Sequence, residues 1–116
     1  MSEKKSTIKI DITLDKEKMP RSIKWSATDI DKEVQDAKAM LLSFFDAKSK
    51  ETLKIDLWTT EMQVVEMDRL IYQTIRALAD SYYKATNNNK LAGAMQQFAK
   101  YFGEESEIIP KEKKNQ

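Results

Sequence analysis

The chain has 116 residues, a formal net charge of +1, a charged fraction of 34%, and neither histidine nor cysteine. This length suits one domain that can hold its core without disulfide bridges. The missing residue types exclude thiol chemistry, disulfides and imidazole acid–base or metal-ligand roles. The balanced charge gives no sign of a nucleic-acid-binding surface. We therefore expect a non-enzymatic interaction protein with no cofactor, no bound metal and no nucleic-acid partner.

The polar residues 1–6 predict a flexible N-terminus. No apolar segment of the secretory type follows them. The longest apolar cluster, residues 39–42, is far shorter than the roughly 20 residues of a membrane-spanning helix. A cytoplasmic location without direct membrane insertion is expected.

Two alternating runs near the N-terminus predict a β-hairpin. In residues 7–14 every second residue is apolar, which is typical of a half-buried strand. Pro20 stands at the edge of a second alternating run that contains Ile23, Trp25 and Ala27. The acidic residues 28–36 are expected to form a loop with at most one helical turn.

Residues 37–46 could form a helix or a strand by composition, since Ala, Lys, Met and Leu favour helices. The strand is preferred because residues 53–58 alternate clearly and a short polar stretch lies between the two segments. With Asp46 opposite Glu51, three pairs share a core face: Phe44 with Leu53, Leu42 with Ile55, and Met40 with Leu57. A slip of one residue would reverse the faces.

From residue 63 the apolar period becomes helical, which predicts one helix to about residue 86 and a second to Gly103. Thr60 and Gln63 have the spacing of a capping box. The Asn87–Asn89 run should end the first helix and cap the second. Gly103 should stop the second helix, and a close approach to a helix or sheet would explain Gly93. The expected stripes are Val64, Met67, Leu70, Ile71, Thr74, Ile75, Leu78 and Tyr82, then Leu91, Ala94, Met95, Phe98, Tyr101 and Phe102.

These elements predict an α+β fold: a four-stranded antiparallel sheet followed by two helices packed on one face, a ββββαα two-layer sandwich. Residues 7–103 should form a single domain. Residues 104–116 should form a charged, mostly disordered tail.

The candidate interaction face lies around Trp58, on the strand face opposite Leu53, Ile55 and Leu57. Contiguous exposed apolar patches usually mark interfaces, and tryptophan is enriched at their centres. The alternative is a tryptophan half-buried by the neighbouring loop or by Met62. If the face is open, it predicts homo-oligomerisation or docking of a protein partner. Its residues are Trp58, Leu41, Phe45, Ala39 and Met62.

Other charged and aromatic residues have simpler explanations. Acidic side chains near the start of the first helix interact favourably with the helix dipole; they are Glu61, Glu66 and Asp68. No EF-hand spacing surrounds them. Lys48 and Lys50 fit a solvated turn, and no catalytic motif is present. Tyr82 fits the buried stripe. Tyr72 and Tyr83 cannot both join it.

Several stretches resemble the gliding motility-associated GldC family of the Bacteroidetes. The most specific is the block at 51–62, ETLKIDLWTTEM; Lys50 directly before it and AKAMLLS at 37–43 fit the same pattern. Shorter matches are IKWSA at 23–27, then Glu66-Met67, Gln73-Thr74, Ala79-Asp80 and Ala85-Thr86. The resemblance extends over roughly residues 7 to 105.

The resemblance implies a cytoplasmic accessory protein or adaptor that binds components of the gliding machinery. It brings no catalytic residue and no cofactor. The order of strands and helices is also similar to the SecB export chaperone, so an alternative is a holdase for unfolded clients. Fold likeness alone does not carry that function.

Overall fold

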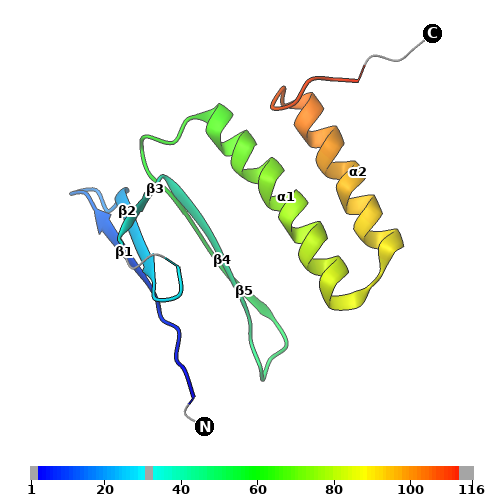
Figure 1. The fold of residues 1–116 in the computed structure, drawn as a ribbon. Coiled ribbons are helices and arrows are strands. Elements are labelled where there is room, and N and C mark those ends of the chain that lie inside the picture. Colours follow the sequence, from blue (N-terminus) through cyan, green and yellow to red (C-terminus); the bar gives the residue numbers. More distant parts are fainter. Residues whose placement is uncertain (1–2, 31–32, 113–116) are drawn as a thin grey trace. The chain divides into compact units, whose positions relative to one another are not determined.

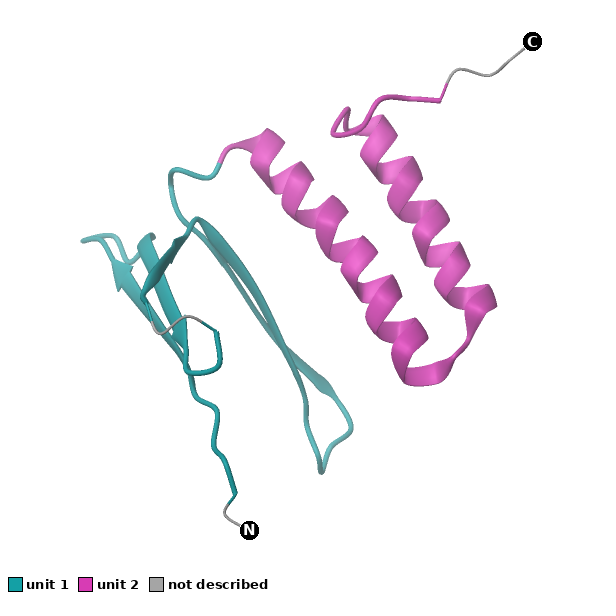
Figure 2. Ribbon diagram, in the orientation of Figure 1, with its two compact units in different colours: residues 1–62 teal, residues 63–116 magenta. Residues whose placement is uncertain are grey.

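The computed structural model describes residues 3–30 and 33–112. The chain divides into two compact units (Figure 2), residues 1–62 and residues 63–116. We call the first the strand unit and the second the helical unit. Figure 1 shows the strands β1 (Ile8–Leu14), β2 (Pro20–Ala27), β3 (Gln35–Ala37), β4 (Ala39–Phe45) and β5 (Thr52–Trp58), and the helices α1 (Val64–Thr86) and α2 (Asn89–Glu105).

The strands β1, β2 and β3 form an antiparallel sheet in that order. The predicted β1–β2 hairpin is confirmed, with Ile10 opposite Trp25 and Ile12 opposite Ile23. The apolar residues therefore share one face, as the alternation predicts. Ile23, only 2% exposed, is the most deeply buried large side chain on that face.

The strands β4 and β5 form a second, two-stranded antiparallel sheet. Its register is the predicted one, with Phe44 opposite Leu53, Leu42 opposite Ile55, and Met40 opposite Leu57. The strand interpretation of residues 39–45 is therefore confirmed over the helical one. The cause is pairing with the alternating strand β5, which outweighs the helix propensity of residues 39–45.

Both hairpin loops are built around an aspartate. The Asp46 carboxylate accepts hydrogen bonds from the Ser49 N–H (2.8 Å) and the Lys48 N–H (3.1 Å). These bonds to the charged form lower the pKa of Asp46 below its ordinary value. In the β1–β2 loop, Asp15 accepts from the backbone of Glu17 and Met19 in the same manner.

The prediction of one four-stranded sheet is wrong, because the strands form two sheets of three and two strands. Residues 35–37, expected in a loop, pair with β2 as β3. The chain then bends at Lys38, and β4 pairs with β5 instead. The Thr59 N–H donates to the Lys38 carbonyl (2.8 Å), so the second ladder begins at the bend. One stretch of chain thus contributes to both sheets.

The helix ends are fixed by side-chain caps. The capping box of α1 joins Gln63 and Glu66, one turn later than expected, and the Gln63 N–H donates to the Glu66 carboxylate (3.1 Å). As predicted, Asn87 ends α1 in the left-handed conformation (φ 57°) and Asn88 caps α2 by accepting from the Leu91 N–H (3.0 Å). Asparagine suits both positions because it tolerates positive φ and carries an acceptor oxygen.

The seam between α1 and α2 differs from the predicted stripes. Its buried residues are small except for one aromatic ring: Tyr72, Ala79, Ala92, Ala99 and Gly103. Large members of the predicted stripes are either half-buried, such as Ile71 and Phe102, or exposed, such as Phe98. Tyr83 is exposed while Tyr72 is buried, as the prediction for this pair requires. Periodicity located the helices, but small residues form the seam because they let helix backbones approach.

The two glycines of α2 also differ from expectation. Gly103 does not end the helix, which continues to Glu105; it is buried against the Tyr72 ring, where a Cβ would lie 2.7 Å from Cε1. Gly93 has the opposite environment, because a Cβ added there would have no neighbouring atom of the helical unit within 4 Å. A close approach therefore explains Gly103 and not Gly93.

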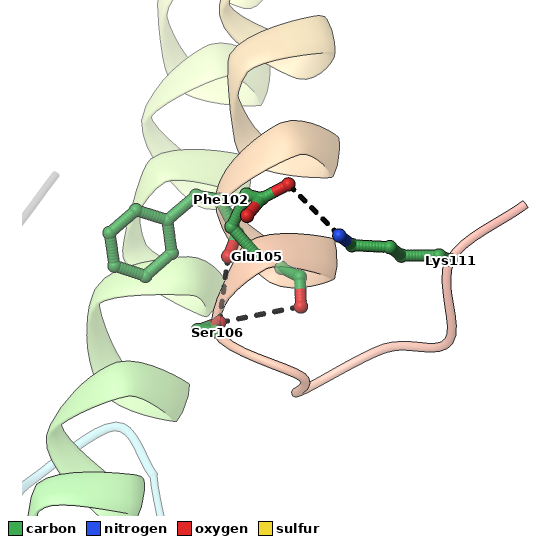
Figure 3. A network of polar contacts seen from close by, with 5 residues as sticks. Phe102, Glu105, Ser106 and Lys111 are labelled. Atoms are coloured by element: carbon green, nitrogen blue, oxygen red, sulfur yellow. Dashed lines mark hydrogen bonds and ion pairs between the residues drawn. The ribbon is translucent and has the colours of Figure 1, made fainter.

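The segment after α2 folds back on the helix (Figure 3). The Ser106 hydroxyl donates to the Phe102 carbonyl (2.7 Å), and Lys111 forms an ion pair with Glu105 (3.2 Å). Lys100 lies 2.7 Å from Glu112, a hydrogen bond that raises the pKa of Lys100. Polar contacts thus continue through the described part of the predicted tail.

Candidate functional site

The β4–β5 hairpin positions the candidate interaction face. Cross-strand pairing places Ala39 opposite Trp58 and Leu41 opposite Asp56, and Phe45 lies on the same side at the loop end. We call this side, with Ala39, Leu41, Phe45, Asp56 and Trp58, the outer face. Four of the five predicted residues are therefore brought together. Met62 lies beyond β5, in a turn in which its N–H donates to the Thr59 carbonyl (3.1 Å).

The aromatic residues of the outer face are well exposed. Trp58 is 52% exposed and Phe45 66%, whereas Ala39 and Leu41 are half-buried. Trp58 also borders a cavity of about 160 Å³ that Met19 and Pro20 line from the start of β2. The indole is thus partly covered and partly open, and its role as a docking residue stays a prediction.

Asp56 adds a charge to this apolar surface. One carboxylate oxygen pairs with Lys54 (2.7 Å), its neighbour on the same side of β5. The other, Oδ1, is shielded from solvent and has no hydrogen-bond partner among the described residues. A shielded acceptor without a donor costs free energy. The outer face therefore combines two exposed rings with one incompletely satisfied carboxylate.

Two features of the strand unit were not predicted from the sequence. Towards the loop, Phe44, Leu53 and Ile55 on the predicted core face are exposed as well. A second cavity, of about 330 Å³, lies at the bend of the chain and is lined in part by Arg21, Asp36, Lys38, Thr59 and Glu61. Thr59 is 3% exposed and its hydroxyl has no partner among the described residues. No sequence motif predicts this cavity, because its residues come together only through the bend at Lys38.

The remaining candidates have local roles. Glu66 belongs to the α1 capping box, and the Lys50 ammonium donates to the Ala47 carbonyl (2.9 Å) inside the hairpin loop. Within residues 3–30 and 33–112, no three acidic side chains converge to hold a metal ion. Neither α1 nor α2 has the length and apolar character needed to cross a membrane.

Comparison with known proteins identifies the family. The model of the gliding motility-associated protein GldC-like family matches residues 20–108, from the first residue of β2 to just beyond α2. No curated protein and no solved structure matches the chain. The matched range holds the whole β4–β5 hairpin and both helices, well over half of the sequence. The chain therefore belongs to the GldC-like family of gliding motility-associated proteins.

Proposed function

We propose that this protein is a non-enzymatic cytoplasmic adaptor that supports gliding motility by binding a protein partner through the outer face of the β4–β5 hairpin. Membership of the GldC-like family supports the link to motility. The exposed rings of Trp58 and Phe45 on one side of a two-stranded sheet are the observation that carries the binding role. Large aromatic residues dominate binding energy when a partner removes them from water.

The outer face indicates the chemistry of its partner. An apolar or aromatic side chain would cover the exposed rings of Trp58 and Phe45. Lys54 beside Asp56 keeps the rim polar, as is usual around the apolar centre of a non-obligate interface.

The test introduces the Trp58→Glu substitution into the chromosome of the native cells. Loss of an aromatic hot-spot residue costs at least about 2 kcal/mol, or roughly 30-fold in Kd. We expect the variant to lose both gliding and the one or two motility proteins that co-purify with the wild type. Tyr101→Glu is the matched control, because Tyr101 is similarly exposed but lies on α2.

Circular dichroism of both variants separates lost binding from lost folding. Retention of the same partners and of gliding by folded Trp58→Glu protein would refute the proposal. Co-purification of a broad set of unfolded chains with the wild type would instead indicate a holdase.

A further inference from the structure

Within the described residues no strand pairs with the outer edge of β1, and this free edge is a second surface of the strand unit. The three-stranded sheet ends at β1 on one side and at the three-residue β3 on the other. The pairing of β1 with β2 is regular from Ile8 to Thr13 and shifts only at Leu14. A straight edge strand presents a row of unpaired N–H and C=O groups, to which another strand can add.

The hydrogen bonds to β2 determine which residues face this edge. The Thr28 N–H donates to the Thr7 carbonyl (3.1 Å), so the backbone groups of Thr7 point toward β2. Because the direction alternates along a strand, Lys9 and Asp11 also bond toward β2. The N–H and C=O groups of Ile8, Ile10 and Ile12 therefore point to the free edge.

A row of alternating charges reaches the same edge on the polar face of the sheet. Asp36 on β3 pairs with Lys24 on β2 (2.8 Å), and Lys24 lies opposite Asp11 on β1. Lys9 is on the same face, 3.7 Å from Asp11, and both side chains are mostly exposed. The row ends at β1 with one positive and one negative charge two residues apart.

We propose that a second copy of this chain adds to the edge, β1 against β1, antiparallel about a two-fold axis at Ile10. In this register Lys9 lies opposite Asp11 of the second copy, and the reverse pair forms across the axis. An axis at Asp11 or at Lys9 would place that residue opposite itself, and like charges directly opposite each other are destabilising. An axis at Ile12 would place Asp11 opposite Thr13 and form no charge pair within β1, since Lys9 would face Asp15 in the loop after the strand.

The backbone and the apolar face agree with this register. Ile10 meets Ile10, and Ile8 meets Ile12, at positions whose free N–H and C=O groups can exchange two hydrogen bonds per pair. Ile8, which is 71% exposed, gains an apolar neighbour. The charge row continues from Asp11 to Lys9 of the second copy. This interface is separate from the outer face, so the Trp58→Glu variant should keep it.

Cysteine cross-linking tests the register directly, since the chain has no cysteine of its own. At the axis the two Cα atoms of residue 10 would lie about 5.5 Å apart, within disulfide range. Mild oxidation should therefore convert the full-length Ile10→Cys variant to a disulfide-linked dimer. Ile12→Cys is the matched control and should stay unlinked, because it faces Ile8. Failure of Ile10→Cys to cross-link, or equal cross-linking of both variants, overturns the proposal.

Charge exchange tests the proposed pairs by solution mass. The wild type should have the mass of two chains at micromolar concentration, and Lys9→Asp and Asp11→Lys should each weaken the dimer at least tenfold. Mixing these two variants should restore it, because each supplies the charge that the other needs. The control Lys16→Asp, in the loop after β1, makes the same charge change as Lys9→Asp and should leave the dimer intact. A monomeric wild type, or a mixture that stays monomeric, contradicts the proposal.

Discussion

At the scale of single residues, two lysines occupy backbone positions that favour glycine. Lys18 and Lys50 each have φ of 62°, near the ends of the two aspartate-initiated loops. A side chain in the left-handed region costs roughly 1–2 kcal/mol, which glycine avoids at some cost in chain entropy. The loops form despite this cost because Asp15 and Asp46 bind the backbone N–H groups that follow them.

We expect Lys50→Gly to raise the free energy of unfolding by about 0.5–1 kcal/mol, measured by urea denaturation. Lys48→Gly is the matched control: it lies in the same loop without a positive φ, and it should be neutral or destabilising. Equal stabilisation by both glycines would show that the left-handed backbone is not the cause.

The sequence was most informative about residues where two patterns had to agree. Residues 53–57 alternate, and placing Asp46 opposite Glu51 across the short loop puts Leu42 and Ile55 on one face, so their pairing was predictable. The conformation of Lys50 was not, because lysine carries no preference for positive φ. The same pairing also placed Ala39 opposite Trp58, so the arrangement of the outer face could be predicted, although its exposure could not.

At the scale of elements, the helical seam depends on a glycine that meets a ring. A Cβ on Gly103 would lie 2.7 Å and 2.8 Å from two carbons of Tyr72 and 3.0 Å from Ile109. Because Tyr72 is buried, the ring cannot swing freely into solvent. We expect Gly103→Ala to destabilise the protein by about 1–3 kcal/mol, measured by thermal or urea unfolding.

Gly93→Ala is the internal control for that experiment. It adds the same methyl group to the same helix, where, apart from the surrounding helix backbone, no atom of the helical unit would lie within 4 Å of it. The variant should be stabilised by up to about 1 kcal/mol, because alanine favours the helix more than glycine does. Destabilisation of both variants by similar amounts would contradict the distinction between the two sites.

The strand β3 and the helical seam are two features that local sequence patterns did not predict. The strand β3 has three residues, Gln35–Ala37, and gains its structure only from pairing with β2, so no periodicity could reveal it. The most deeply buried helical positions were not predicted for another reason. Hydrophobicity ranks large side chains first, whereas Ala79, Ala92 and Ala99 are among the residues that the two helices bury most deeply. Small residues decide how closely helices approach, and hydrophobicity does not record this.

At the scale of the whole molecule, each unit exposes apolar side chains that its own packing leaves uncovered. In the strand unit these include Ile8, Phe45 and Trp58, on β1 and on the outer face. Two different partners would cover them: a second copy would cover Ile8, and a motility protein would cover the outer face. A dimer joined by β1 would present two outer faces, so binding of one partner complex could become bivalent, with a higher apparent affinity.

The helical unit, by itself, should be only marginally stable. Its fully buried residues are few and mostly small: three alanines, a glycine and one tyrosine among the described residues. Two helices of 23 and 17 residues gain most of their stability from packing. We expect a fragment of residues 63–116 to show less helix per residue than the full chain and a broad thermal transition by circular dichroism. The fragment's spectrum should be the same at all concentrations. A change on dilution would show that self-association, rather than the seam, holds the helices folded. A sharp transition at the midpoint of the full chain would show that this small-residue seam is sufficient to hold the two helices folded.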